Sequence, residues 1–83
     1  MRHARPDYER FQDPAGLIPD EEPVFLIRGQ DAIGARAVRH YALLAAREGA
    51  DPDLIQRCLN HADRMDAWPK HKTPDLPKGV PNG

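Results

Sequence analysis

The prolines of this 83-residue chain restrict where regular helix can form. Eight of the nine lie outside residues 32–68, and the remaining one, Pro52, occupies a position where a helix can begin. Proline lacks a backbone N–H and its ring clashes with the preceding turn, so it interrupts a helix interior. We therefore expect a single small domain at residues 20–69, preceded by an extended arm (1–19) and followed by an extended or flexible tail (70–83).

The first helix of this domain is predicted at about residues 32–48. Asp31 can cap its N-terminus, because an aspartate side chain accepts hydrogen bonds from the free N–H groups of a first turn. Gly49 follows the last turn and suits the left-handed conformation that ends many helices. Spacings of three and four residues indicate an apolar face, made of Ile33, Ala37, Val38, Tyr41, Ala42, Leu44 and Ala45.

The second helix is predicted at about residues 52–68. Asp51 and Pro52 fill the N-cap and the first helical position, and Pro69 stops the helix because a residue before proline avoids helical geometry. The link between the helices is short, so we expect an antiparallel helical hairpin in a mostly α protein. The apolar stripe of the second helix is Leu54, Ile55, Cys58, Leu59, Ala62, Met65 and Trp68.

A run of four apolar residues, 24–27, stands before the hairpin and belongs to a predicted element at residues 24–28. Its β-branched and aromatic residues, bounded by Pro23 and Gly29, favour a short buried strand. A short helix capped by Asp20 is the alternative. A lone strand leaves backbone groups unpaired, so we expect it to pair across the symmetric interface of a homo-oligomer. The interface residues would be Val24, Phe25, Leu26 and Ile27.

Size and composition also favour an oligomer. A chain this short buries only about 60% of its unfolded surface, and 40% of its residues are hydrophobic. Cys58 is the single cysteine, so no disulfide within one chain can compensate. No apolar run approaches the ~20 residues that cross a membrane. We therefore expect a cytoplasmic protein that acts without a membrane.

The charge pattern argues against nucleic acid as the main partner. The net charge is −1, and residues 32–68 carry five arginines against five acidic residues. A domain dedicated to duplex binding usually has a basic face and a high isoelectric point. The basic tail and the acidic segment at residues 13–22 would instead suit contacts with another protein.

Motifs for catalysis, metal binding or cofactor binding are missing. Cys58 and His61 could share one helix face, but zinc needs three or four converging ligands. Gly29 and Gly34 stand apart from any phosphate-binding glycine motif. Cys58 lies within an apolar stripe, which is typical of a structural thiol. We therefore expect a protein that is not an enzyme and that holds no metal or cofactor.

Three stretches of the chain resemble small uncharacterised proteins of phages and prophages. They are DEEPVFLIRGQD at residues 20–31, AVRHYA at 37–42 and NHADRMDAWP at 60–69, so the resemblance covers roughly residues 17–69. It implies a phage or prophage setting and a host-cell location, and it assigns no activity or site. Small phage proteins often counter host defences, by sequestering a nucleotide signal or by masking a protein surface.

Candidate ligand-binding residues cluster around the predicted start of the first helix. A helix N-terminus attracts anions, and several cationic or polar residues follow the apolar run closely. Two aromatic residues could stack on a base. The ligand-binding set is Arg28, Gln30, Arg36, Arg39, His40, Tyr41 and Trp68. The competing interpretation is that these arginines are solvated or paired, and that Trp68 closes the hairpin core.

The leading hypothesis is a non-enzymatic, oligomeric binding protein that sequesters an anionic, nucleotide-like signal. One alternative is an inhibitor or adaptor of a host or phage protein, with the arm and the tail as contact elements. A second alternative is an accessory protein that binds nucleic acid or assists virion assembly.

Overall fold

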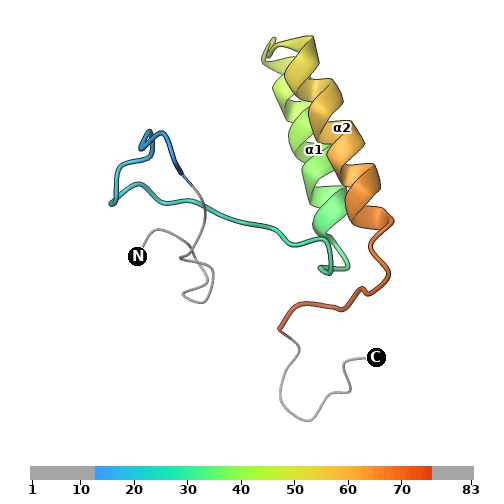
Figure 1. Cartoon of the computed structure of the whole chain (residues 1–83). Coiled ribbons are helices and arrows are strands. Elements are labelled where there is room, and N and C mark those ends of the chain that lie inside the picture. The colour runs from blue at the N-terminus through green and yellow to red at the C-terminus, as the bar shows by residue number, and fades with distance from the viewer. Residues whose placement is uncertain (1–12, 76–83) are drawn as a thin grey trace.

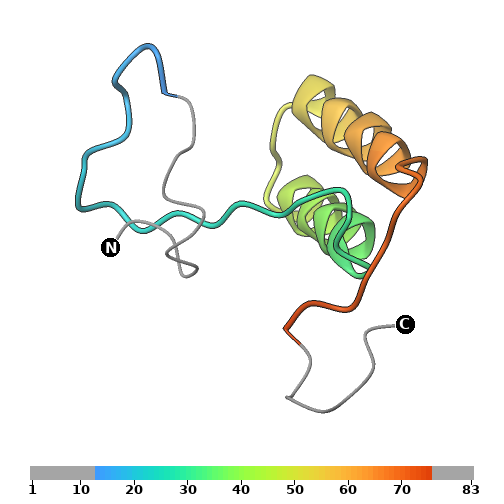
Figure 2. The ribbon, with the colours of Figure 1, turned by 60° about the horizontal axis from the view of Figure 1, so that its bottom comes forward.

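The computed structural model describes residues 13–75 and shows a helical hairpin. Helix α1 (Gly34–Arg47) and helix α2 (Pro52–Asp66) lie side by side and antiparallel (Figures 1 and 2). Within residues 13–75 there is no other helix and no named strand. Neither helix is long and apolar enough to cross a membrane. The prediction of a mostly helical protein built on an antiparallel hairpin is confirmed.

The turn between the helices follows from Gly49. This residue has φ +78°, the left-handed conformation that side chains with a Cβ rarely adopt. Its N–H donates to the Ala46 carbonyl (3.1 Å), and the Ala50 N–H donates to the Ala45 carbonyl (3.0 Å). These two bonds form a Schellman motif, which satisfies the last carbonyls of α1 and reverses the chain.

Helix α2 begins where the sequence predicts. The Asp51 carboxylate accepts a hydrogen bond from the Asp53 N–H (2.9 Å), and Pro52 is the first helical residue. The helix ends at Asp66, two residues before the predicted end. The Trp68 N–H still donates to the Met65 carbonyl (3.2 Å), but Trp68 itself lies outside the helix.

Helix α1 begins two residues later than predicted, and Asp31 is not its N-cap. The N-cap is Ile33, which makes no side-chain capping bond. The Asp31 carboxylate accepts from the Ile33 N–H (2.9 Å), and its carbonyl accepts from the Gly34 N–H (3.0 Å). Asp31 therefore stabilises a tight turn ahead of the helix, because an aspartate readily bonds a backbone N–H two residues on.

The strand predicted at residues 24–28 is not found within the single chain. Val24 forms an isolated β-bridge, and residues 25–28 then run as irregular chain toward α1; the alternative short helix is wrong. Further along the chain, a parallel bridge pairs Asp31 with Lys72. The Ala32 N–H donates to the Lys72 carbonyl, and the Lys72 N–H donates to the Gln30 carbonyl, both at 2.8 Å. The chain after α2 thus returns to the turn before α1.

The core is small and lies between the helices at the end where α1 begins. Ala35, Ala62 and Met65 are buried together, with Ile27 and Val38 packed against them. Alanines on facing sides allow two helices to approach closely. The apolar stripe predicted for α2 is buried or half-buried from Leu54 to Met65, but Trp68 is exposed. On α1 the prediction is partly wrong: Ala35 was missed, and Ile33, Ala37, Tyr41 and Leu44 are exposed.

The chain before the hairpin leads away from it (Figure 2). Asp13 organises its first turn: its two carboxylate oxygens accept the N–H groups of Leu17 (3.2 Å) and Ile18 (3.0 Å). The Gly16 N–H donates to the Asp13 carbonyl (3.0 Å). Residues 1–12 and 76–83 of the predicted arm and tail lie outside the described residues.

Candidate functional site

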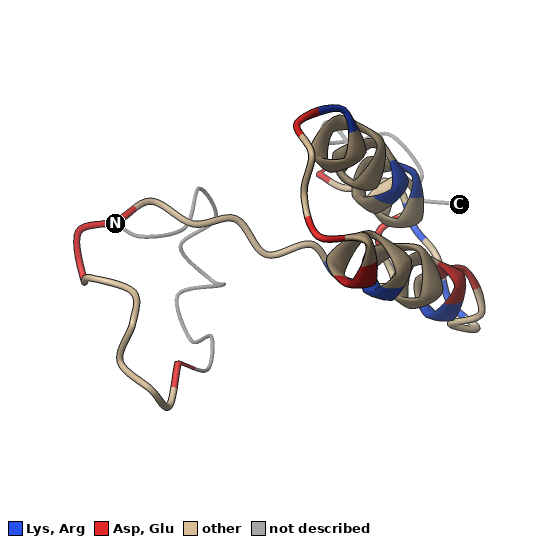
Figure 3. Ribbon diagram, turned by 90° about the horizontal axis from the view of Figure 1, so that it is seen from above, with Lys and Arg blue, Asp and Glu red and all other residues tan. Residues whose placement is uncertain are grey.

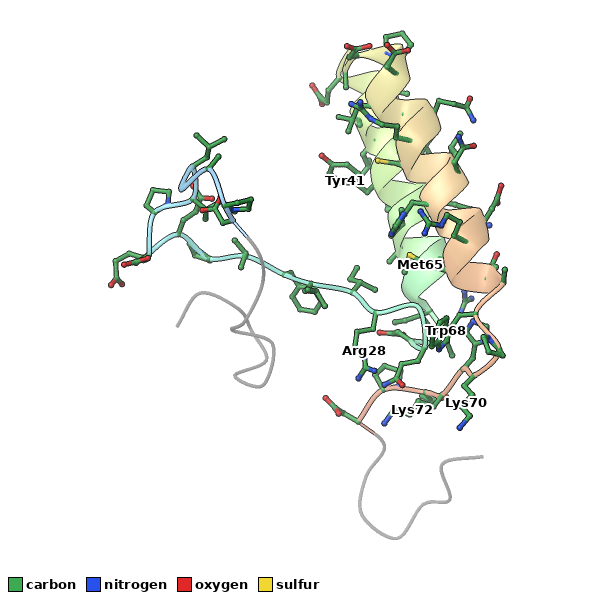
Figure 4. All side chains as sticks on the ribbon, in the orientation of Figure 1. Arg28, Tyr41, Met65, Trp68, Lys70 and Lys72 are labelled. Carbon is green, nitrogen blue, oxygen red and sulfur yellow. The ribbon has the colours of Figure 1, made fainter. Side chains whose placement is uncertain are left out.

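A pocket lies where the end of α2 meets the turn at residues 28–30. Its volume is about 580 Å³, and it is open to solvent. Figure 4 shows Arg28 and Trp68 at this end of the hairpin, below the helices. The lining residues are Arg28, Gly29, Gln30, His61, Arg64, Met65, Ala67 and Trp68.

Helical spacing supplies one wall of the pocket. His61, Arg64, Met65 and Trp68 follow one another at spacings of three, one and three residues, which places them on one side of α2 and its C-terminal extension. Met65 is buried toward the core and forms the floor, while His61 and Arg64 are exposed at the rim.

The turn at residues 28–30 supplies the other wall, and Gly29 sets its distance from α2. A Cβ atom at Gly29 would stand 3.6 Å from Trp68 Cβ and 3.7 Å from Met65 Cα, so the turn backbone is already near contact. The Asp31 N–H donates to the Arg28 carbonyl (3.0 Å) and closes the turn. Arg28 is thereby held beside the pocket with its side chain exposed.

The pocket lining is cationic. It contains two arginines and a histidine and no carboxylate. Within residues 13–75 the arginine ion pairs are those of Arg39, so the guanidinium groups of Arg28 and Arg64 have no carboxylate partner there. Acidic residues lie along the arm, and residues of both charges occur on the hairpin (Figure 3). Two unpaired guanidinium groups at one pocket favour an anion.

Trp68 brings an aromatic face to the same pocket. Its side chain is 56% exposed, so it does not close the hairpin core as the competing interpretation supposed. Lys70 and Lys72 lie at the same end of the molecule (Figure 4). His71 Nε2 donates to the Met65 carbonyl (3.1 Å), which satisfies a carbonyl at the end of α2 and holds this segment against the hairpin.

Arg39, one of the predicted ligand residues, lies outside the pocket. Its guanidinium donates to Asp63 Oδ1 (2.9 Å) and lies 2.7 Å from Asp66 Oδ2, both on α2. The hydrogen bond to Asp63 and then that to Asp66 raise the pKa of Arg39 above its ordinary value. Arg39 therefore joins the two helices and has its charge compensated.

The other predicted residues on α1 also lie outside the pocket lining. Arg36, His40 and Tyr41 are exposed on α1 and do not contribute to this cavity. Only Arg28, Gln30 and Trp68 of the predicted ligand set line it. Antiparallel packing brings α2 and the turn at 28–30 together, and it turns the exposed side of α1 elsewhere.

Sequence reasoning missed His61, Arg64 and Met65 as pocket residues. Their spacing relative to Trp68 is visible in the sequence, but the sequence places Met65 in the apolar stripe of the second helix and does not show which segment faces His61 and Arg64. No group of three or more His, Cys, Asp or Glu side chains suited to a metal occurs in the described part of the chain. Cys58 is a half-buried free thiol.

No protein-family model, curated protein or solved structure matches this chain. Its function has to be inferred from the chemistry of the pocket itself. The features that carry chemistry there are the guanidinium groups of Arg28 and Arg64 and the indole of Trp68.

Proposed function

We propose that this protein is a non-enzymatic binding protein that holds an anionic, nucleotide-like ligand in the pocket at the base of the hairpin. One observation carries the proposal: two arginines without a carboxylate partner in the described chain and an exposed tryptophan line one pocket that has no acidic residue. A phosphate paired with a flat heterocyclic base is the ligand class that uses both groups together.

The two arginines would bind the phosphate. A guanidinium presents a planar fork of donors that matches phosphate oxygens two at a time. Arg28 comes from the turn and Arg64 from α2, so a phosphate between them would connect the two walls. Gln30 and His61 add hydrogen-bonding groups at the rim. Lys70 and Lys72, on the segment that follows Trp68, would add a longer-range attraction for anions.

Trp68 would bind the base. Stacking of a base on an aromatic side chain contributes about 1–3 kcal/mol and tolerates different bases. The exposed face of Trp68 therefore suits a class of nucleotides better than one particular base. Recognition of the phosphate and of the ring together would distinguish a nucleotide from free phosphate.

Binding without catalysis is proposed because the pocket is open. Enzyme sites commonly exclude water as they close over a substrate, whereas this cavity faces solvent broadly. A second subunit covering the open side would raise affinity, in keeping with the expected homo-oligomer. Val24, Phe25 and Leu26 are its predicted interface residues, whereas Ile27, predicted with them, packs against the core of its own chain. The phage resemblance suggests sequestration of a host defence signal as the biological role.

The test is a thermal-shift and calorimetric panel on the full chain. The panel comprises inorganic phosphate, AMP, ATP, a cyclic dinucleotide and adenosine. A ligand at 100 times its Kd stabilises the folded state by about 2.7 kcal/mol, so a true ligand gives a clear rise in melting temperature. We expect this rise to be lost in Arg28→Ala and in Arg64→Ala.

Arg57→Ala is the matched control, because Arg57 is exposed on the same helix and does not line the pocket. Binding that survives both Arg28→Ala and Arg64→Ala but fails in Arg36→Ala would place the site on α1 and reject the pocket. No stabilisation by any phosphorylated compound would reject the ligand class.

A further inference from the structure

Helix α1 carries a second apolar stripe that takes no part in the hairpin core. Ile33, at its N-cap, is followed by Ala37, Tyr41 and Leu44 at spacings of four, four and three residues, so the four side chains lie along one side of the helix. The larger three are 47%, 56% and 45% exposed, and Ala37 is exposed as well. We call these four residues the outer stripe.

Ile33 and Leu44 face away from α2, and Tyr41, adjacent to the buried Ala42, lies at the edge of the outer stripe. Ile33 and the fully buried Ala42 are nine residues apart, which is about two and a half helical turns. Leu44 follows Ala42 by two residues and therefore also points to the opposite side. Figure 4 shows the Tyr41 side chain extending from α1 on the side away from α2. The outer stripe is thus a separate, mainly apolar surface, with the exposed His40 between Ala37 and Leu44 on the same side of the helix.

We propose that the outer stripe is the contact surface for a second copy of this chain, with the two α1 helices packed antiparallel about a two-fold axis. A two-fold contact uses the same patch on both subunits. In the antiparallel register Ile33 of each subunit packs against Leu44 of the other, and Ala37 packs against Tyr41. Each large side chain then meets either a complementary large one or the small alanine.

Charges at the two ends of the outer stripe fit this register. Arg47 ends α1, and Asp31 lies just before its first turn. Antiparallel packing brings Arg47 of one subunit toward Asp31 of the other, at both ends of the contact. The Asp31 carboxylate accepts one bond, from Ile33, and a carboxylate has capacity for several. A parallel arrangement would instead bring Arg47 beside Arg47.

The dipoles of the two helices also favour this orientation, because antiparallel packing brings the positive end of each α1 beside the negative end of the other. The contact is short, and interfaces much below about 1,000 Å² are weak or transient. We therefore expect a dimer that dissociates on dilution, with a dissociation constant on the order of micromolar.

Sedimentation velocity across a concentration series of the full chain tests the proposal. We expect the wild-type protein to change from monomer to dimer, and Leu44→Glu to raise the dissociation constant at least about tenfold by burying an unpaired charge. Leu43→Glu is the matched control, because Leu43 is 47% exposed on a different side of α1. Circular dichroism of both variants verifies that the hairpin remains folded.

Cross-linking tests the orientation. In a Cys58→Ser background, Ala37→Cys and Tyr41→Cys proteins are mixed and oxidised, and we expect disulfides between the two different variants. A wild-type chain that stays monomeric up to about 1 mM would overturn the proposal. This holds whether the outer stripe is then exposed to solvent or covered by another part of its own chain. The proposal would also be overturned if Leu43→Glu and Leu44→Glu weakened the dimer equally. Disulfides between two Ala37→Cys chains, without any between Ala37→Cys and Tyr41→Cys chains, would overturn it as well.

Discussion

Gly34 lies against the backbone of Arg28 so closely that a Cβ atom on Gly34 would stand 2.9 Å from the Arg28 carbonyl oxygen. The same Cβ would also stand 2.9 Å from Ile27 Cγ2 and 3.0 Å from Met65 Cε. The first residue of α1 is therefore the point where the helix, the segment before it and the core of the hairpin converge. This contact also positions the turn that forms one wall of the pocket.

Gly34→Ala is predicted to destabilise the protein, although alanine ordinarily stabilises a helix by roughly 0.5–1 kcal/mol relative to glycine. Inserting a methyl group into a packed site costs about 1–3 kcal/mol, and one of the obstructing atoms belongs to the backbone. Urea unfolding followed by circular dichroism measures the change. Ala46→Gly, at an exposed position of α1, calibrates helix propensity. If the Gly34→Ala protein is as stable as the wild type, the neighbouring atoms can shift to accommodate the methyl group at little cost.

Gly49→Ala is predicted to destabilise the hairpin for a different reason. Nothing lies within 4 Å of a Cβ built on Gly49, so the cost comes from its positive φ alone. A left-handed conformation costs an ordinary residue about 1–2 kcal/mol. Gly49→Asn should lose less stability than Gly49→Ala, because asparagine tolerates this conformation better than alanine. The same urea measurement compares the two variants, and equal losses would contradict the conformational explanation.

The contacts of Arg39 with Asp63 and Asp66 are predicted to contribute a small, salt-sensitive stabilisation. Arg39→Gln should lower the melting temperature at low salt, with little difference in about 1 M NaCl, where the screening length is about 3 Å. Arg36→Gln on the same helix is the control. A loss that is unchanged by salt would mean that Arg39 acts mainly through packing.

The contacts of Arg39 with Asp63 and Asp66 also predict how stability depends on pH. The carboxylates raise the pKa of Arg39, so its contribution is complete below the pKa of the unfolded chain. The contribution is lost only as pH rises through the still higher folded pKa, in strongly alkaline solution. The difference in melting temperature between wild type and Arg39→Gln should therefore be constant between about pH 6 and pH 9. A difference that changes across this range would point to another titrating group.

Trp68 is predicted to report ligand binding directly, because it is the single tryptophan of the chain. Stacking of a base on its exposed face should quench its fluorescence saturably during titration with AMP. Arg64→Gln should shift the titration to higher concentration without removing the quench. Adenosine, which lacks the phosphate, should bind about tenfold or more weakly, as loss of a charge-assisted contact implies. Equal affinity for AMP and adenosine would contradict the role of the arginines.

Residues close together in the sequence account for the local structure of the hairpin. Asp51, Pro52 and Gly49 act through their own backbone and side-chain geometry, so their positions predict the start of α2 and the turn before it. The role of Asp31 does not follow from local geometry alone. The sequence predicts its capping chemistry, but its carboxylate accepts the Ile33 N–H in a turn ahead of the helix.

The tertiary structure alone decided which residues meet. Residues 28–30 lie far in sequence from the end of α2 and from Lys72. Their contacts depend on how the hairpin packs and on the backbone pairing at Asp31. Periodicity gave α1 one apolar face, whereas the fold divides its apolar residues between a core of small side chains and the outer stripe. Hydrophobic spacing reveals that a side chain prefers burial, but only packing determines which neighbour buries it.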